Sequence, residues 1–266
     1  MMKNIRTIFR KEIASFFNSL IGYMVMSVFL IGVGLFFWVF EYNILESGIT
    51  QMDGLFIYAP YMFLFLVPAI TMRAFSEEMK TGTIEFLATK PITTWQIILG
   101  KYFASIFLVF FSLLPTLLYV LSVNWLGVLN QPSPSGGVAI GQIFTSIFSG
   151  ESNLDMGATW GAYVGLFFIG AIFAAIGLFT SSLTENQIVA FILGVFLCFF
   201  FYLGFDFVAG IKVLDAVNAL FLKLGILNHY DSISRGVIDT RDLLYFISFI
   251  TVTLILTYLV VNKRMK

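Results

Sequence analysis

The chain has 266 residues, of which 59% are hydrophobic and only 11% are charged, and its mean hydropathy is +0.94. An ordinary soluble domain carries about 25% charged residues, so this composition excludes a soluble protein and predicts an integral membrane protein. Fifteen basic and fifteen acidic residues cancel, so net charge gives no reason to expect a nucleic acid as a partner. The single cysteine, Cys198, excludes an intrachain disulfide and a thiolate metal site, and we expect it to be a buried packing residue.

The chain begins with a predicted amphipathic helix over residues 1–19. Apolar side chains recur at helical spacing between Ile5 and Leu20, and basic residues, including Lys3 and Arg10, take the other face. This pattern is typical of a helix that lies on the inner membrane surface, whether it only anchors the chain or also takes part in gating. The apolar run that follows is long enough to span and has no A-x-A-like cleavage site, so we expect a retained helix rather than a signal peptide.

Six apolar runs are each of the length that crosses a membrane. A hydrocarbon core of about 30 Å needs roughly 20 apolar residues in a helix, and none of these runs contains Asp, Glu, Lys, Arg or His. The predicted spans are Leu20 to Phe40, Leu55 to Met72, Tyr102 to Trp125, Met156 to Leu183, Asn186 to Phe205, and Leu243 to Val261. The expected fold class is an all-α polytopic membrane protein, with residues 1–266 forming a single transmembrane domain.

The basic residues orient the chain, because short segments rich in Lys and Arg remain cytoplasmic. Eleven of the fifteen lie before the first span, between the second and third spans, or in the tail after the sixth. The first two connections on the other side, 41–54 and 126–155, contain no Lys or Arg. We therefore expect a multi-pass protein of the inner (cytoplasmic) membrane, with both termini in the cytoplasm.

The third external connection, residues 206–242, mixes four basic residues with five aspartates. Its apolar stretch "VLDAVNALFLKLGI" is interrupted by Asp215, Asn218 and Lys223, so it predicts one or two short helices at the outer leaflet. A seventh span here would also export the basic tail. His229, the only histidine, cannot form a zinc site alone, so we expect a surface or interfacial position and no metal site.

A polar segment, residues 73–101, separates the second and third spans and carries local signals for a rigid structure. Ser76 is expected to cap a short turn that Gly82 ends, and Thr83 to cap a second turn. The segment is either a solvated hairpin or an element that receives force from a soluble partner. Spacing alone favours the hairpin.

Several features of the spans predict how they begin and pack. Thr93 and Gln96 form a capping-box pattern that opens the third span. Pro60, Pro68 and Pro115 should kink or loosen the second and third spans. Small residues in the fourth span allow close helix approach, either within one subunit or between subunits. They are Gly157, Gly161, Gly165, Ala171 and Ala175.

The chain lacks the motifs of an energy source or a membrane enzyme. A P-loop requires G-x-x-x-x-G-K-[ST], and the only Gly-Lys pair, at residues 100–101, has Trp95 where the first glycine should be. Ion coupling is disfavoured because the predicted spans hold no ionisable residue. The residue sets of intramembrane proteases are also missing. We expect no catalytic residues and no nucleotide hydrolysis by this chain.

Three stretches resemble the ABC-2 type permeases. They are "FSEEMKTGTIEFLATKPITTWQIILGKY" after the second span, "GLFTSSLTENQIVAF" between the fourth and fifth, and "YDSISRGVIDTRDLLYF" leading into the sixth. The resemblance covers nearly the whole chain and extends to the gliding-motility-associated permease subunit. It implies the membrane half of an ATP-binding-cassette transporter, with six spans, an amphipathic amino-terminal helix, a coupling helix within residues 73–101 and short external helices before the sixth span.

The resemblance also assigns roles to three groups of residues. The segment that docks into a separate ATPase subunit would use Glu77, Gly82, Thr83, Glu85, Leu87, Pro91 and Lys101. A second and smaller contact would come from Glu185 and Asn186. The residues that would order the external end of the sixth span are Asp231, Arg235, Gly236 and Asp239. No cofactor is implied for this chain, since ATP and Mg would be bound by the partner.

The sequence thus favours a permease subunit that pairs with an identical or different second permease and binds two copies of a cytoplasmic ABC ATPase. Closure of the ATPases would open a path between the permeases, and the resemblance favours export over import. Two alternatives remain. One is a complex that transmits force for motility or envelope machinery without moving a solute, and the other is an ATP-independent channel or scaffold.

Overall fold

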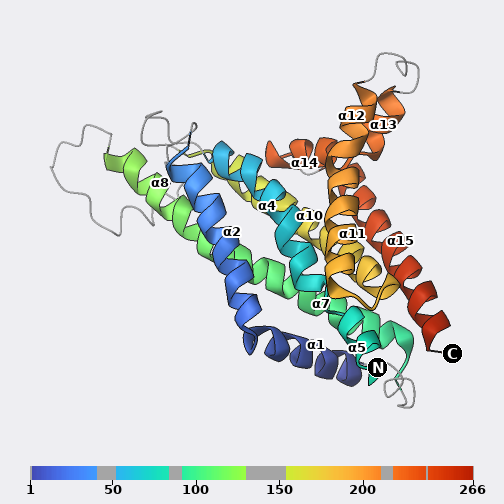
Figure 1. Ribbon diagram of the computed structural model, residues 1–266. Coiled ribbons are helices and arrows are strands. Elements are labelled where there is room, and N and C mark those ends of the chain that lie inside the picture. Colours follow the sequence, from blue (N-terminus) through green and yellow to red (C-terminus); the bar gives the residue numbers. More distant parts are fainter. Residues whose placement is uncertain are drawn as a thin grey trace.

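The computed structural model describes residues 2–40, 52–83, 92–129, 154–210, 218–237 and 239–265, and every regular element within them is helical (Figure 1). The α-helices are α1 (Met2–Phe17), α2 (Leu20–Trp38), α4 (Asp53–Thr71), α5 (Ser76–Lys80), α7 (Thr94–Leu113), α8 (Leu117–Leu129), α10 (Met156–Leu183), α11 (Gln187–Phe199), α12 (Phe205–Ala209), α13 (Asn218–Leu224), α14 (Ile226–Ser234) and α15 (Thr240–Arg264). A 3₁₀ turn, η1 (Leu114–Thr116), joins α7 to α8, and a π-helical turn, η2 (Phe200–Gly204), joins α11 to α12.

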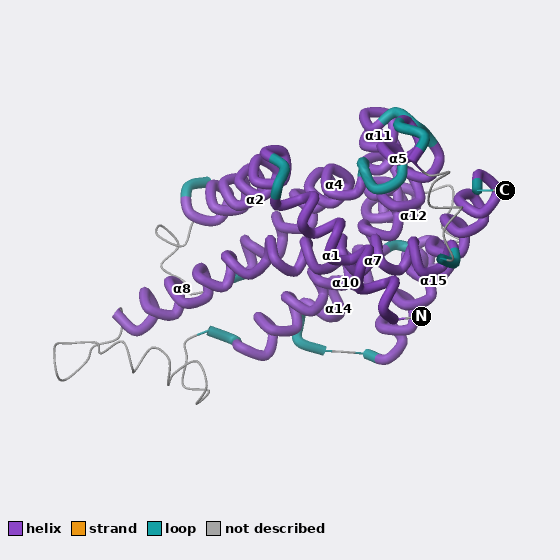
Figure 2. Tube along the Cα trace, turned by 90° about the horizontal axis from the view of Figure 1, so that it is seen from below, coloured by secondary structure: helices purple, strands orange, loops and turns teal. Residues whose placement is uncertain are grey.

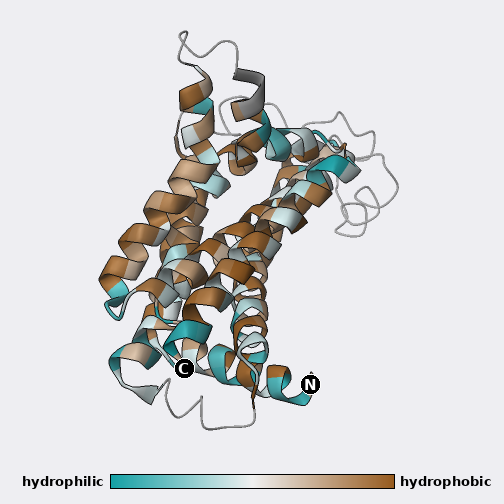
Figure 3. Ribbon diagram, turned by 90° about the vertical axis from the view of Figure 1, so that its right-hand side faces the viewer, coloured by the Kyte–Doolittle hydropathy of each residue, from teal (hydrophilic) through white to brown (hydrophobic). Residues whose placement is uncertain are grey.

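Six helical segments of the described chain are long and apolar enough to cross a membrane, and each coincides with one of the predicted spans. Both chain ends lie at one end of the bundle, together with α1 and α5, and we call this the terminal end (Figure 1). Hydrophobic residues cover the long helices, and polar residues gather toward their ends (Figure 3). The opposite end carries α12, α13 and α14. The six-span prediction is therefore confirmed.

Helix α10 lies at the centre of the bundle, where it packs against α4, α7, α11, α14 and α15. Its small residues make this possible, because a Cβ at Gly161 would lie 2.6 Å from the Ile233 carbonyl oxygen and one at Gly165 would lie 2.9 Å from the Tyr230 ring. At the other end of α10, a Cβ at Gly177 would collide with the Thr71 side chain of α4. These glycines thus serve packing within one subunit.

The three prolines have different effects on their helices. Pro115 divides the predicted third span into α7, η1 and α8, as expected of a residue that cannot donate to the preceding turn. Pro60 and Pro68 lie inside α4, which remains one continuous helix. Because Pro60 has no N–H, the carbonyl of Phe56 loses its helical donor, and the Tyr230 hydroxyl of α14 donates to it at 2.8 Å instead.

Helix α1 packs against α7. Ile8 is buried against Gly100 of α7, and a Cβ added at Gly100 would lie 2.8 Å from the Ile8 side chain. Phe9 and Phe17 make edge-to-face contacts with Phe107 and Phe111 of α7, at ring-centroid distances of 5.7 and 5.1 Å. The predicted amphipathic helix is confirmed, and part of its apolar face packs against α7, which lies beside it (Figure 2).

At the opposite end, the connection into α15 contains short helices and, among the described residues, no seventh membrane-length helix. Within the predicted stretch, residues 213–226, the described part forms α13, and α14 begins at its last residue, Ile226; Asp215 lies outside the described residues. Most residues of the connections 41–54 and 126–155 also lie outside the described residues.

The close approach of α10 and α14 gives a test of the packing. Gly161→Ala should lower the free energy of unfolding by about 1 to 3 kcal/mol despite the better helix propensity of alanine, because its Cβ would meet backbone atoms of Ile233 and Gly236. Thermal unfolding in detergent can be followed by reaction of a thiol dye with the buried Cys198. The control is Gly210→Ala, whose Cβ would have no neighbour nearer than 3.5 Å. Equal midpoints for the two variants would contradict the packing assignment.

Candidate functional site

The short helix α5 is attached to the bundle by hydrogen bonds from its own backbone. The N–H groups of Phe75 and Ser76 both donate to the Ser181 hydroxyl oxygen of α10, at 2.9 and 3.1 Å. Ser181 donates in turn to the Met72 carbonyl at 2.9 Å. These bonds satisfy backbone groups that the end of α4 and the start of α5 leave without helical partners. The turn between the two helices is therefore fixed to the end of α10.

The prediction that Ser76 caps this turn is wrong. Phe75 occupies the N-cap position, and the oxygen that accepts from the first N–H groups belongs to Ser181. The Ser76 hydroxyl instead donates to the Met72 carbonyl of the preceding turn. A serine one residue inside the helix bonds backward along its own chain, which leaves the capping position to a side chain from another helix.

The solvent-exposed surface of α5 and its following turn includes three of the predicted site residues. Glu77, Gly82 and Thr83 are all exposed. Gly82 has φ +70°, a conformation that favours glycine, and it ends the helix as predicted. The Thr83 hydroxyl donates to the Glu78 carbonyl at 3.3 Å, which folds the turn back on α5. The remainder of the predicted segment, with Glu85, Leu87 and Pro91, lies outside the described residues.

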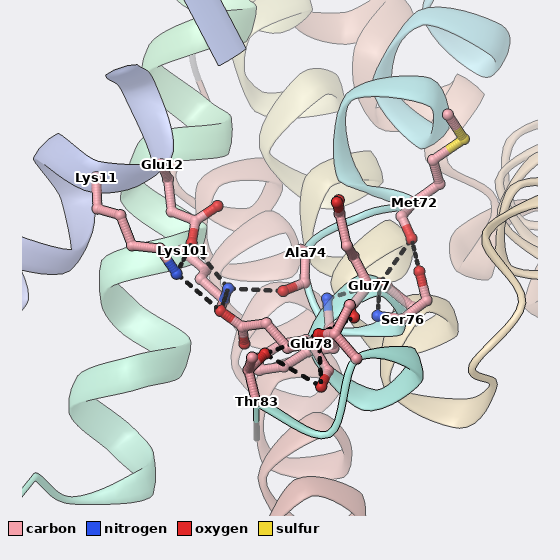
Figure 4. A network of polar contacts seen from close by, with 12 residues as sticks. Lys11, Glu12, Met72, Ala74, Ser76, Glu77, Glu78, Thr83 and Lys101 are labelled. Carbon is pink, nitrogen blue, oxygen red and sulfur yellow. Dashed lines mark hydrogen bonds and ion pairs between the residues drawn. The ribbon is translucent and has the colours of Figure 1, made fainter. Parts of the chain in front are cut away.

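Beneath α5 lies a buried ion network centred on Lys101 of α7 (Figure 4). The Lys101 ammonium donates to Glu12 Oε1 of α1 at 2.8 Å, to Glu78 Oε1 of α5 at 3.0 Å and to the Ala74 carbonyl at 2.6 Å. Lys11 of α1 also reaches Glu78 Oε1, at 3.0 Å. Three acceptors match the three N–H donors of the ammonium, so the buried cation is fully hydrogen-bonded.

This geometry changes the role expected for Lys101. The residue is only 2% exposed and is enclosed by groups of its own chain, so it is placed to hold α1, α5 and α7 together rather than to touch a soluble partner. Separating these helices would leave charges buried without counterions, which is far costlier than breaking a surface ion pair.

The predicted second contact lies in the turn between α10 and α11. Asn186 caps α11 by accepting from the Ile188 N–H at 2.9 Å. Glu185 is exposed, with 68% of its side chain accessible, and lies 3.9 Å from Arg264 of α15. Arg264 also donates to the Leu183 carbonyl at 2.7 Å and contacts the Met79 sulfur of α5 at 3.1 Å. The turn is thus joined to both α15 and α5.

The start of α7 completes the site. Thr93 is its N-cap residue, and the predicted capping box with Gln96 is present. Gln96 Oε1 accepts from the Thr93 N–H at 3.3 Å and from the Asn4 side chain of α1 at 3.2 Å. Trp95 stacks on Tyr258 of α15 with ring centroids 4.8 Å apart. The segment 92–101 therefore connects α1, α7 and α15.

The residues predicted to order the external end of the sixth span lie together at the opposite end. Asp239 caps α15 by accepting from the Arg241 N–H at 2.9 Å. Gly236 has φ +83° and its Cα lies directly against α10. Asp231 and Arg235 line a cavity of about 650 Å³. Partial burial raises the pKa of the Asp231 carboxyl above its ordinary value, and the nearby Arg235 opposes this rise.

His229 also lies at this end, at the interface of three short or terminal helical segments. Its Nδ1 is 2.7 Å from Asp242 Oδ1 of α15, and its Nε2 is 3.0 Å from the Lys223 carbonyl of α13. The ring stacks on Tyr245 with centroids 3.9 Å apart. The sequence did not predict these partners, and the expected surface or membrane-interfacial role of His229 stays a prediction.

Glu12, Glu78, Ser181 and Arg264 were not among the predicted site residues. Their partners lie between 23 and 185 residues away along the chain, so no local spacing rule identifies them. One feature of the sequence could have indicated them. Lys101 follows an uncharged stretch, so it has no acidic neighbour there and requires acidic partners from other helices. Glu12 and Glu78 each border an apolar span, at the depth where such partners are needed.

The chain combines helical spans, an amphipathic first helix and a polar helix that is fixed beneath two of the spans. These features define a multi-pass membrane protein with an exposed element at its terminal end. The family model described as ABC-2 family transporter protein matches residues 6–265, nearly the whole chain, and the chain belongs to this family. A search of curated proteins finds no match. Family membership makes the chain a membrane permease subunit of an ABC transporter, which works with an ABC ATPase and is not itself the catalytic subunit.

The ion network gives a test of the site. Lys101→Gln should lower the free energy of unfolding by about 3 to 5 kcal/mol, because Glu12 and Glu78 would lose their buried cation and keep only the exposed Lys11 as a counterion. Adding Glu78→Gln to this variant should recover part of the loss. Glu185→Gln is the control, since its ion pair is long and exposed and should contribute less than about 1 kcal/mol. Similar unfolding midpoints for Lys101→Gln and Glu185→Gln would show that the network is not structural.

Proposed function

We propose that α5 and the turn after it form the coupling element on which the ABC ATPase acts, and that the buried network beneath them transmits this action to the spans. The observation that carries the proposal is the contrast within α5. Glu77, Gly82 and Thr83 are exposed, whereas Glu78 is buried and bonded to Lys101. A partner that pushes on the exposed side therefore displaces groups held by α1, α7 and α10.

We further propose that the terminal end faces the cytoplasm. Supporting this orientation, most of the basic residues fall in the amino-terminal helix, the segment 73–101 and the carboxyl-terminal tail. This places α5 and the 184–186 turn on the side where a soluble ATPase and its nucleotide are found. The membrane would then be the inner, cytoplasmic one.

The energy source in this proposal is ATP with Mg bound to the ATPase, because the sequence contains no P-loop of its own. Two permease subunits, identical or different, would each receive one ATPase copy. Glu185 and Asn186 would form the smaller contact beside α5, since Arg264 links this turn to Met79 of α5. Closure of the two ATPases would then move two coupling elements together and open a path between the subunits.

The direction we propose is export, and a role in gliding motility is supported only by the sequence resemblance described above. The alternative of force transmission without a solute would use the same coupling element. Reconstituted vesicles separate the two: ATPase activity stimulated by a transported solute supports export, and coupled ATPase activity without solute movement supports the mechanical function.

The coupling role of α5 predicts loss of the partner on charge reversal. Glu77→Arg should reduce recovery of the ATPase on purified permease by about tenfold or more, because a reversed charge at an interface costs several kcal/mol. Recovery is measured by quantifying both subunits after gentle detergent extraction. The control is Val237→Arg, which adds the same side chain at a 62% exposed position of the opposite end. Undiminished ATPase recovery with Glu77→Arg would argue against the proposal.

The orientation has a separate test. In a Cys198→Ser background, Lys80→Cys and Val237→Cys place one thiol at each end, both at exposed positions. A membrane-impermeant maleimide applied to intact spheroplasts should label residue 237 and should reach residue 80 only after permeabilisation. The reverse pattern would place α5 outside the cell and end the coupling assignment.

A further inference from the structure

A cavity of about 330 Å³ lies beside the ion network, enclosed by α1, the start of α2, the end of α4, α5 and α7. Its volume is within the range of small-molecule sites, about 300 to 1,000 Å³. The lining includes three basic and three acidic side chains, which are Lys11, Arg73, Lys101, Glu12, Glu77 and Glu78. Because these charges balance, the cavity suits a zwitterion without net charge better than a simple anion or cation.

Two charged groups of the lining have an atom that lacks a hydrogen-bond partner within the described part of the chain. They are Arg73 Nε, just beyond the end of α4, and Glu78 Oε2, and both atoms are buried. Glu78 as a whole residue is only 9% exposed, and its other oxygen is already bonded to Lys101 and Lys11. Buried charged groups are costly to leave unbonded. Two residues of the cavity wall therefore each hold a buried atom without a hydrogen-bond partner, one a cationic donor and the other an anionic acceptor.

The position of the cavity indicates where its ligand comes from. It lies where the surface helix α1 turns into the membrane-length helix α2, which is the depth of lipid headgroups. The rest of its wall combines five hydroxyl side chains with apolar or small residues, among them Ile21, Ala69, Ile70 and Leu108. A ligand with a zwitterionic head and acyl chains can satisfy both parts of such a wall.

We propose that this cavity binds the headgroup of a phospholipid that carries a phosphate and a primary ammonium, as in phosphatidylethanolamine. Arg73 would donate to a phosphate oxygen, and Glu78 Oε2 would accept from an ammonium N–H. A choline headgroup has no N–H to donate, and a phosphoglycerol headgroup has no cation for Glu78. The proposal depends on the membrane-spanning fold and is independent of the coupling role of α5.

The test is native mass spectrometry of the delipidated full-length chain with equal amounts of phosphatidylethanolamine, phosphatidylcholine and phosphatidylglycerol. The first lipid should be retained about tenfold more strongly than the other two, since one hydrogen bond to a charged group corresponds to at least that factor. Glu78→Gln should remove this preference, because the headgroup ammonium would lose its anionic acceptor. Arg10→Gln should keep it, because Arg10 is an exposed basic residue of α1 that does not line the cavity.

A second variant covers the case in which Glu78→Gln does not fold. Ala69→Leu adds bulk at the cavity wall while leaving both charged groups in place, and it should also remove the preference. Equal retention of the three lipids by the unmodified chain, or an unchanged preference in the variants, would overturn the proposal. Competition by soluble phosphoethanolamine as effective as that by the lipid would also overturn it, because the ligand would then be a soluble zwitterion.

Discussion

A single buried cation determines how the terminal end of this permease is assembled. The Lys101 ammonium is almost fully withdrawn from solvent and can remain charged there only because Glu12, Glu78 and the Ala74 carbonyl surround it. These acceptors come from the surface helix, the polar helix and the turn between α4 and α5. The requirement to satisfy one charge therefore helps to fix α5 and the turn before it relative to α1 and α7, which also share apolar contacts. Apolar packing alone would leave the register of α1 and α5 on α7 less defined, since it is not directional.

The same requirement recurs wherever the helical hydrogen-bond pattern is interrupted. Pro60 leaves the Phe56 carbonyl without a helical donor, and the Tyr230 hydroxyl of α14 donates to it instead. The turn after α4 leaves donors and acceptors that Ser181 satisfies from α10. In a membrane no water is available for these groups, so the backbone groups freed at each interruption must hydrogen-bond to another helix. The hydrogen bonds made at these interruptions thus link the helices of the bundle. The glycines of α10 let the helices approach closely enough for those bonds to form.

This division explains which parts of the molecule could be predicted from the sequence. The spans follow from long uncharged runs, and the turn at Gly82 follows from a glycine placed after a short polar stretch, because both signals are local. Ser76 shows the limit of such reasoning: its type and position favoured a cap, but the acceptor came from Ser181, more than one hundred residues later. Lys101 was predicted to take part in docking a soluble partner, and spacing does not reveal that it is buried beside Glu12.

The pattern of links also indicates the route that a displacement of α5 would follow. The polar helix is bonded to Ser181 at the end of α10, which contacts α4 closely where Gly177 meets Thr71. Its other link, through Lys101, enters α7, but the third span changes to a 3₁₀ turn at Pro115 before continuing as α8. A helix with such a break bends more easily than a continuous one, so motion entering α7 is partly absorbed there. Helices α4 and α10 are each continuous from the polar helix toward the opposite end, and the Tyr230 bond to Phe56 joins α4 to α14. Helix α10, which has no interior proline, therefore forms the stiffer path between the two ends of the permease.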